Sequence, residues 1–319
     1  MNDATRTQAV GLIGARGYAG RELLRFIDGH PNLRLGFAAS RSLAGELIRD
    51  SVPAWPGDEV FVEATPDALA DLEADLFILA LPNGLSGEYL PKINAQAVVV
   101  DLSADHRFDE DWAYGLPELG RDDLLDARRI ANPGCYATAT MLALAPIASL
   151  LEAEPSAFGV SGYTGAGTDP SPKNDPDLLR DNLMPYQLTG HMHEREIAHQ
   201  LGQPVRFAPS VAPFERGLVV TVLAQMHQPT DIESLAEAYR DRYSADPLIE
   251  IKSETPLPRD GAGRIEATIG GFSVDPVDPR RIGVAVALDN LLKGAASQAV
   301  QNINLACRFE SLAGLRPSA

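Results

Sequence analysis

Cysteine and histidine side chains supply the chemistry that this sequence can be expected to perform. Cys135 stands in "ANPGCYATA", directly behind Asn-Pro-Gly and at the head of an apolar segment predicted to be helical. A thiol at a helix N-terminus meets the positive end of the helix dipole, which lowers its pKa and favours the nucleophilic thiolate. A packed core cysteine is the alternative. That alternative fits Cys307 better, because it follows Leu305 and Ala306 in an apolar terminal segment.

Two of the six histidines stand close enough in sequence to act together as acid/base partners of a thiolate. His191 and His193 lie in "TGHMHEREI", and Glu196 of the same segment is a candidate for substrate contact. A His-x-His pair can also bind zinc, but no second cysteine or histidine cluster completes a tetrahedral ligand set. We therefore expect acid/base chemistry and no metal site. The sequence leaves open which histidine acts, and a surface pair without a role is the alternative.

Arginines near these residues are candidates for binding an anionic substrate. The formal net charge of −17 opposes such a substrate, so a local guanidinium group must bind it. Ser103 and Arg107 follow a predicted strand in "DLSADHRFD", at the sheet edge where ligands of doubly wound folds bind. Arg216 in "FERGL" directly precedes a long β-type run. Together they could form a phosphate and carboxylate clamp, and ordinary surface charges are the alternative.

A glycine-rich turn early in the chain predicts a dinucleotide site. In "GLIGARGYAGRELL", glycines lead from an apolar strand into a helix, where the backbone can pass close to a pyrophosphate at the helix N-terminus. The spacing G-x-x-G-x-x-G differs from the commoner G-x-G-x-x-G, so a plain tight turn is the alternative. The candidate cofactor contacts in the turn are Gly11, Gly14, Ala15, Arg16 and Gly17.

The end of the second predicted strand indicates which dinucleotide fits. An NAD site usually carries an acidic residue there, which binds the ribose hydroxyls, whereas this chain has Ser40 and Arg41. A hydroxyl and a guanidinium group suit a 2′-phosphate, so NADP(H) is favoured over NAD. The alternative is that Arg41 is an ordinary solvated loop residue.

The elements that must position these residues indicate the α/β class. In the first third, short apolar runs alternate with amphipathic segments, which is typical of parallel strands joined by crossover helices. Further along, the runs become longer and more β-rich, which favours a mixed or antiparallel sheet in a second domain. The predicted strands are 9–14, 33–40, 75–82, 95–103, 157–163, 217–226, 264–274 and 281–288, and an amphipathic helix is predicted over 290–309.

Length, charge and composition exclude several classes of protein. A chain of 319 residues with 45 % apolar residues can bury two hydrophobic cores. Its negative charge argues against nucleic acid or an anionic membrane as partner, because both require a basic surface. No apolar stretch approaches the roughly 18 residues of a membrane span, and the first residues lack the pattern of a secretory signal. We expect a cytoplasmic protein with two reduced thiols.

The motifs taken together resemble the N-acetyl-gamma-glutamyl-phosphate reductase family, within the aspartate-semialdehyde dehydrogenase superfamily. The combination of Asn-Pro-Gly-Cys-Tyr, Gly-His-x-His and Asp-Asn-Leu-x-Lys-Gly is specific, and the resemblance runs from residue 11 to about 304. The stretches that carry it are "GLIGARGYAGRELLR", "SRSLAG", "ALPNGLS", "DLSADHRF", "YGLPEL", "NPGCYATA", "GYTGAG", "GHMHEREI", "RGLVVTV" and "DNLLKGAASQAVQNIN".

The resemblance implies a mechanism and site residues. Cys135 would attack an acyl phosphate and release phosphate, NADPH would reduce the resulting thioester, and the hemithioacetal would collapse to the aldehyde. One histidine of the pair, with His193 slightly favoured, would be the acid/base group, and His191 would bind or position substrate. Arg107 would contact the phosphate. Gly165 matches a glycine turn near the cofactor, and Asn290 matches an amide close to the nicotinamide.

The resemblance also implies an architecture. An N-terminal Rossmann-type doubly wound sheet, residues 1–133 and 290–319, would bind NADP. A second α+β domain with a mixed or antiparallel sheet, residues 134–289, would be inserted before a returning C-terminal helix. Family members assemble as homodimers or homotetramers through the sheet of the second domain, and the partner otherwise expected is a small acyl phosphate.

Some positions depart from the family pattern, and alternative functions stay open. Asn83 stands where the family has histidine, Ser210 replaces another common histidine, and "GYTGAG" differs from Ser-Gly-Ala-Gly. Aspartate-semialdehyde dehydrogenase shares the nucleophile and cofactor. A lysine-pathway reductase of carrier-linked aminoadipyl phosphate would need a basic surface for its acidic carrier. A non-enzymatic NADP-binding redox sensor is the third alternative.

Overall fold

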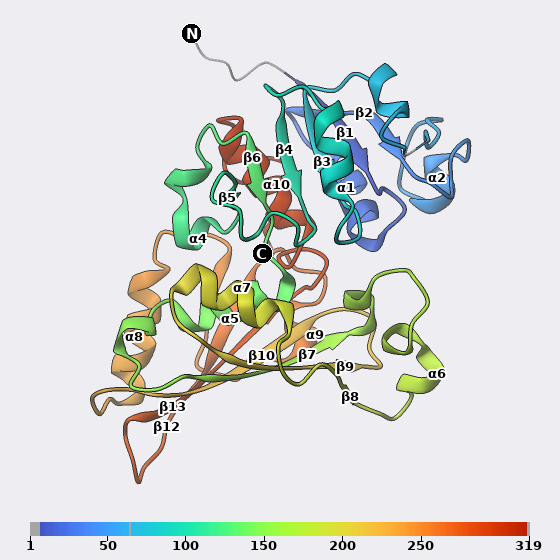
Figure 1. Ribbon diagram of the computed structural model, residues 1–319. Helices are drawn as coiled ribbons and strands as arrows, with labels where there is room; N and C mark the ends of the chain where they lie inside the picture. The colour runs from blue at the N-terminus through green and yellow to red at the C-terminus, as the bar shows by residue number, and fades with distance from the viewer. Residues whose placement is uncertain (1–6, 64, 318–319) are drawn as a thin grey trace. The chain divides into compact units, whose positions relative to one another are not determined.

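The computed structural model describes residues 7–63 and 65–317, and the chain divides into two compact units. The first unit takes in the chain up to Gly134 together with Ala295–Arg316, and the second comprises Cys135–Gly294. Each unit is built on one sheet (Figure 1). The chain therefore leaves the first unit directly before the candidate nucleophile Cys135 and returns to it directly after Gly294.

The first unit contains a sheet of six parallel strands. Its order, β2-β1-β3-β4-β6-β5, changes direction at β1, which pairs with β2 on one side and β3 on the other. Ligands of doubly wound sheets bind beyond the carboxyl ends of the strands at such a switch point. The predicted Rossmann-type sheet is confirmed. The strands are β1 (Gln8–Ile13), β2 (Leu33–Ala39), β3 (Leu76–Leu79), β4 (Val98–Asp101), β5 (Ala113–Tyr114) and β6 (Arg129–Ala131).

One longer helix, α1 (Tyr18–Asp28), follows the glycine turn of the first unit. Its apolar stripe is buried through Leu23, Leu24 and Ile27, as the spacing predicts, and the N–H of Gly29 closes its end by donating to main-chain carbonyls. The remaining helices of this unit are α2 (Ile48–Ser51), α3 (Ser86–Tyr89), α4 (Pro117–Gly120) and α10 (Ala296–Ala306).

The terminal helix differs from the amphipathic helix predicted over 290–309. α10 starts at Ala296, and every residue of it is buried, because it packs against both α1 and β4. Its polar side chains have internal partners: the amide of Asn302 donates to the carbonyl of Gly115 at 2.9 Å, and that of Asn304 to Ala313 at 2.9 Å. Buried polar groups are tolerated when they are hydrogen-bonded, so the helix needs no solvent face.

The second unit contains a mixed sheet of seven strands, which confirms the expected sheet type. Its order is β11-β12-β13-β10-β7-β9-β8, with parallel pairs β11–β12 and β7–β9 and antiparallel pairs elsewhere. Both edges of β10 are therefore paired, with β13 and β7. The strands are β7 (Ser156–Gly162), β8 (Met184–Pro185), β9 (Arg206–Ala212), β10 (Leu218–Gln225), β11 (Ile249–Ile251), β12 (Ala267–Val274) and β13 (Arg281–Leu288).

Helices cover one face of this second sheet (Figure 1). They include α5 (Cys135–Leu144), α7 (Met192–Leu201) and α8 (Ile232–Arg242), while α6 (Pro176–Leu179) and α9 (Pro258–Gly261) are single turns in loops. On the other face Phe158 of β7 and Leu223 of β10 are 48 % and 52 % exposed. Across residues 7–63 and 65–317, none of the helices has the length and apolarity of a membrane span.

The turn after β1 yields a stability prediction. Gly14 has φ +87°, and a Cβ there would overlap the carbonyl oxygen of Ala80. We expect Gly14→Ala to lower the free energy of unfolding by about 2 kcal/mol or more. Gly17→Ala is the matched control, because Gly17 has φ −60° and an added Cβ would have no neighbour closer than 3.5 Å. Urea unfolding measures both, and equal midpoints would contradict the argument.

Candidate active site

Cys135 is the first residue of α5, as the sequence predicts for a reactive thiol. Cys135 is partly exposed, whereas every following residue of the helix is buried. The first turn of the helix contains no acidic side chain. The helix N-terminus therefore stabilises a thiolate at this position. Gly294 lies against it, since a Cβ added to Gly294 would be 2.6 Å from the Cβ of Cys135. The sequence analysis did not select Gly294, although the glycine of "DNLLKG" was a signal for it.

His191 and His193 are brought together at the start of α7. His191 is the N-cap of that helix, and its Nδ1 accepts the main-chain N–H of His193 at 3.2 Å. The two ring centroids are 4.8 Å apart. Because the cap uses the lone pair of Nδ1, a neutral His191 carries its proton on Nε2. His191 is thus set up as a hydrogen-bond donor through Nε2.

The surroundings of His191 keep its ring neutral. Burial lowers the pKa of His191, and the positive charge of Lys173 lowers it further, while Glu196 acts in the opposite direction. Glu196 is fully buried on α7, one turn beyond His193. Glu196, predicted as a substrate contact, is thus an electrostatic neighbour of His191, and Lys173 is a functional candidate that the sequence analysis missed.

Aromatic rings enclose the two histidines. Tyr136 contacts His193 at a centroid distance of 6.0 Å, and Tyr186 contacts His191 at 5.7 Å. The hydroxyl of Tyr136 donates to the carbonyl of Ser210 at 2.7 Å, which ties the tyrosine to β9. Burial raises the pKa of Tyr186, and the negative charge of Cys135 adds to that shift. The thiolate and the histidines therefore share one partly desolvated environment in the second unit.

Arg216 is held by a buried carboxylate. Its Nε and Nη2 donate to the two oxygens of Asp289 at 2.8 and 3.1 Å. Asp289 is fully buried and also accepts the main-chain N–H groups of Gly263, Leu291 and Leu292 at 2.5, 2.8 and 3.1 Å. A fork-to-fork pair of this kind fixes the guanidinium plane. Asp289 is a supporting residue that the predicted site lacked, although it opens the same "DNLLKG" motif.

Asn290 is occupied by protein partners. Its Oδ1 accepts the N–H of Gly217 at 2.8 Å, and its Nδ2 donates to the hydroxyl of Thr164 at 2.9 Å. Gly165 follows Thr164 in the predicted glycine turn, and a Cβ there would lie 2.9 Å from the hydroxyl oxygen of Ser161. Asn290 therefore fastens the turn containing Gly165 to the main chain directly after Arg216.

The glycine turn of the first unit has the form of a dinucleotide site. Gly11 is packed so closely that a Cβ would lie 2.6 Å from the ring of Phe37. The N–H groups of Gly14 and Ala15 both donate to the carbonyl of Ala39 at 3.1 Å, so an anion must instead be met by the first-turn amides of α1. Gly20, which the sequence analysis did not single out, allows α1 to pack on the turn, because a Cβ there would be 2.7 Å from the oxygen of Gly14.

The two residues predicted to bind a 2′-phosphate differ in exposure. Arg41 is exposed directly after β2, where a guanidinium group can reach a ligand. Ser40 is buried, and its hydroxyl oxygen accepts the N–H of Leu43 at 3.2 Å. No acidic side chain occupies either position, so the edge of the sheet fits a phosphate better than a free ribose hydroxyl pair.

Ser103 and Arg107 follow β4 and are largely buried. The hydroxyl of Ser103 donates to Asp101 at 2.7 Å, and burial raises the pKa of that carboxyl group. Arg107 donates from Nε to the carbonyl of Asn132 and from Nη2 to that of Leu102, both at 2.9 Å. These contacts brace the carboxyl end of β4 against the segment that leads to Cys135.

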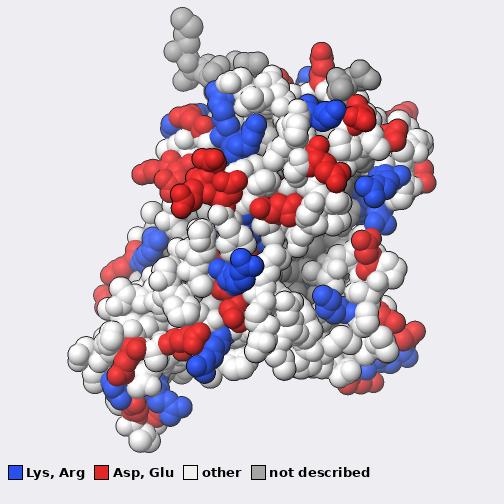
Figure 2. All heavy atoms as spheres, viewed as in Figure 1, with Lys and Arg blue, Asp and Glu red and all other residues white. Residues whose placement is uncertain are grey.

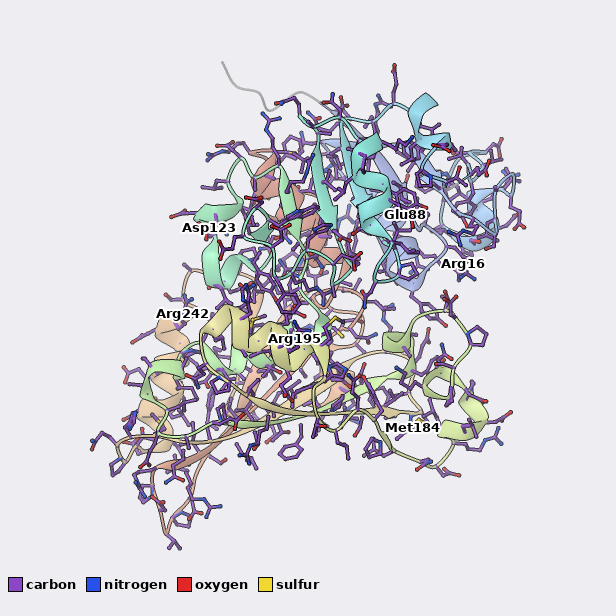
Figure 3. The ribbon with its side chains drawn as sticks, viewed as in Figure 1. Arg16, Glu88, Asp123, Met184, Arg195 and Arg242 are labelled. Carbon is purple, nitrogen blue, oxygen red and sulfur yellow. The ribbon has the colours of Figure 1, made fainter. Side chains whose placement is uncertain are left out.

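Charge is unevenly distributed over the molecule. Figure 2 shows acidic side chains gathered in patches on the visible face, with separate arginines and lysines between them. Figure 3 shows Arg16 at the turn after β1, and Arg195 on α7, the helix that begins beside the two histidines. In the described ranges 7–63 and 65–317, no group of three or more His, Cys, Asp or Glu side chains could hold a metal ion.

Comparisons with known sequences match both units. Residues 9–127 match the family model described as "Semialdehyde dehydrogenase, NAD binding domain", and residues 135–290 match "Semialdehyde dehydrogenase, dimerisation domain". An N-acetyl-gamma-glutamyl-phosphate reductase of Xanthomonas axonopodis pv. citri (strain 306) is 48 % identical over 312 residues, covering 97 % of this chain and 98 % of that protein. One from Stenotrophomonas maltophilia (strain R551-3) is 46 % identical over 318 residues, covering 99 % of each.

Solved structures share the fold. An aspartate semialdehyde dehydrogenase II of Vibrio cholerae, complexed with ASA, superposes with a TM-score of 0.75 at 21 % identity, covering 95 % of this chain and 99 % of that one. An aspartate semialdehyde dehydrogenase of Candida albicans with NADP gives a TM-score of 0.71 at 15 % identity, covering 95 % and 98 %. Identities this low establish the common fold and leave the substrate undecided.

The pair between Arg216 and Asp289 yields a second prediction. We expect Asp289→Asn to lower the free energy of unfolding by about 3 kcal/mol, because a fully buried amide nitrogen would face the hydrogen-bond donors that the carboxylate accepts and the charge pair with the partly exposed Arg216 would be lost. Asp275→Asn is the control, since Asp275 pairs with Arg281 in an exposed hairpin at 3.2 Å. Thermal unfolding measures both variants. A wild-type midpoint for Asp289→Asn would contradict the proposed support of Arg216.

Proposed function

Because the chain belongs to the N-acetyl-gamma-glutamyl-phosphate reductase family, we propose that it reduces N-acetyl-γ-glutamyl phosphate to N-acetylglutamate 5-semialdehyde and phosphate, a step of arginine biosynthesis. The observation that carries the proposal is the position of Cys135 at the N-terminus of α5, in the same unit as the histidine pair. That combination supplies a thiolate and an acid/base group, which an acyl phosphate requires.

The first chemical step belongs to Cys135. Its thiolate adds to the acyl carbon, and the C–O bond to phosphate breaks, so that phosphate leaves with the bonding pair and a thioester remains. When NADPH is bound, its nicotinamide supplies the hydride that reduces the thioester carbonyl carbon. The hydroxyl of the resulting hemithioacetal then loses its proton, the C–S bond breaks, and the aldehyde and the Cys135 thiolate are released.

The two histidines take different roles in the proposal. His191 is capped through Nδ1 and kept neutral by burial and Lys173, so its Nε2–H donates a hydrogen bond to the developing oxyanion. That leaves His193 as the group that gives and takes the proton. Arg216, fixed by Asp289, binds an anionic group of the substrate. Arg107 and Ser103 act through the main chain that they brace.

The first unit is the NAD(P)-binding domain, and its residues fit NADPH. Gly14 lets the backbone turn tightly, and the first-turn amides of α1, which has no acidic residue there, suit the pyrophosphate. We assign the 2′-phosphate to Arg41, which is exposed directly after β2. Arg16 lies beside Gly14 in the turn after β1 and adds positive charge beside the pyrophosphate.

We further propose that the chain forms a homodimer through the uncovered face of the second sheet. The matching dimerisation model spans residues 135–290, a range that includes every strand of that sheet. Phe158 lies directly opposite Thr221 on the neighbouring strand, and Leu223 follows two residues on, so the three side chains point to one face. Exposed apolar side chains of this kind mark an interface.

The activity test is the reverse reaction, followed by the absorbance of the reduced cofactor. We expect phosphate-dependent reduction of NADP with N-acetylglutamate 5-semialdehyde and a strong preference over aspartate semialdehyde. Cys135→Ser should abolish turnover, whereas Cys307→Ser should not, because burial raises the pKa of that second thiol to about 11. Substantial activity of Cys135→Ser would exclude the thioester route. A preference for aspartate semialdehyde would assign the chain to the neighbouring activity.

The same assay tests the cofactor assignment. We expect Arg41→Ala to raise the KM for NADP about tenfold while leaving that for NAD nearly unchanged, because only NADP carries the 2′-phosphate. Equal effects on both cofactors would remove Arg41 from this role.

The interface is tested by sedimentation equilibrium. We expect Leu223→Glu to shift the protein towards the monomer, because a carboxylate would be buried without a partner at the interface. Val277→Glu is the control, since Val277 is 91 % exposed in a hairpin turn. An unchanged molecular mass for Leu223→Glu would overturn this choice of face.

A further inference from the structure

A lysine of the second unit has so far entered only through its electrostatic effect on His191, and no ligand contact has been assigned to it. Lys173 lies in the single turn Pro172–Asn174, between the glycine turn and β8. The amide of Asn174 donates to the carbonyls of Gly167 and Asp169 at 2.9 and 2.8 Å, and its Oδ1 accepts the N–H of Ser171 at 2.8 Å. The turn that carries Lys173 is therefore fastened to the segment of Gly165 and Gly167, which limits the positions that Lys173 can take.

The ammonium group of Lys173 lies over an aromatic ring of the histidine environment. Its Nζ is 4.7 Å from the centroid of the Tyr186 ring, and that ring is 5.7 Å from the ring of His191. The main-chain N–H of Tyr186 donates to the carbonyl of Pro209 at 3.2 Å, which joins the tyrosine to β9. Lys173 thus contacts Tyr186, and Tyr186 in turn contacts His191.

The charge of Lys173 lacks a compensating carboxylate. Within residues 7–63 and 65–317, no salt bridge joins Lys173 to an acidic side chain, whereas Lys92 and Lys252 pair with Asp67 and Glu250. A partly buried ammonium group over a ring has lost part of its hydration, and an anion can restore the lost interaction. Since the formal net charge of −17 opposes an anionic substrate, local cations have to bind it.

The electrostatic effect of Lys173 reaches the histidine as well. Its positive charge lowers the pKa of His191, second to burial, which shows that the ammonium group and the imidazole share one field. An anion bound between them would meet the ammonium charge and the Nε2–H donor together. This is the arrangement that a phosphate or carboxylate oxygen requires.

We propose that Lys173, positioned on the ring of Tyr186, is a binding residue for an anionic group of the substrate, either the phosphate or the carboxylate. This inference rests on the proposed function, because that reaction has a phosphate and a carboxylate to bind. Lys173 supplies a point charge, whereas Arg216 supplies a planar fork, so the two cations can bind different anionic groups.

Steady-state kinetics of the reverse reaction test the proposal. We expect Lys173→Met to raise the KM of one anionic substrate about tenfold, with a smaller change in kcat, and Lys173→Arg to restore part of the loss. A higher KM for inorganic phosphate assigns Lys173 to the phosphate, and a higher KM for the semialdehyde assigns it to the carboxylate. Lys252→Met, which removes a paired lysine of the same unit, should leave both KM values unchanged. Unchanged KM values for Lys173→Met would overturn the proposal.

A binding measurement separates this inference from the proposed function. Iodoacetamide alkylates Cys135, and we expect inorganic phosphate or N-acetylglutamate to slow that alkylation in the wild type and much less in Lys173→Met. Tyr186→Leu, which removes the ring but keeps the lysine, should show an intermediate loss of protection. If the wild type lacks turnover but shows this protection, Lys173 binds an anion and only the assigned reaction fails. Equal protection of wild type and Lys173→Met would exclude the lysine.

Discussion

The buried carboxylate of Asp289 is the interaction on which the arrangement of the second unit depends. It accepts two hydrogen bonds from Arg216 and three from the main chain of Gly263, Leu291 and Leu292. A buried carboxylate is costly unless its oxygens are hydrogen-bonded and its charge is neutralised, and here both conditions are met. The carboxylate therefore fixes the positions of the segments around Arg216, Gly263 and Leu291 relative to one another.

The residues that follow Asp289 extend this constraint to the nucleophile. Asn290 fastens the main chain of Gly217 and the hydroxyl of Thr164, and Gly294 leaves room for the Cβ of Cys135. The short segment that begins at Asp289 thereby sets the orientation of the Arg216 guanidinium group, of the turn containing Gly165 and of the start of α5. This explains why a motif without an acid, base or nucleophile of its own can be as informative as the cysteine motif.

Positive charge at the site is supplied by a few held side chains in a strongly acidic protein. Arg216 is held by Asp289, and Lys173 by the ring of Tyr186. The first cation is compensated within the protein and the second is not, so they differ in what they can offer to a ligand. Such local cations can bind an anion at short range, because solvent and salt screen the distant negative charges.

The sequence by itself determined the fold class and placed the strands β1 to β4, β7, β10, β12 and β13, but not β9 or the shorter strands, and it selected Cys135 and the histidine pair as candidate reactive groups. Strand positions followed from apolar runs bounded by turn residues, and Cys135 at a helix start followed from Asn-Pro-Gly before helix-forming residues, because these signals are local. The glycine turn after β1 was also a local signal, although its reason was only partly visible, because the close approach of Gly14 to Ala80 involves the end of another strand.

Only the tertiary structure decided how polar side chains are used. Asp289 gained its role from Arg216, 73 residues away in the chain, and Lys173 and Tyr186 gained theirs from contacts across an irregular loop, which no periodicity reveals. Arg107 and Ser103 stay predicted ligand contacts, and the structure adds the internal hydrogen bonds to main chain and to Asp101 that hold them in place. α10 was predicted to have a solvent face and is buried throughout, since its asparagines find carbonyl partners in other segments. A polar side chain in a sequence implies either water or a partner, and only the folded chain shows which.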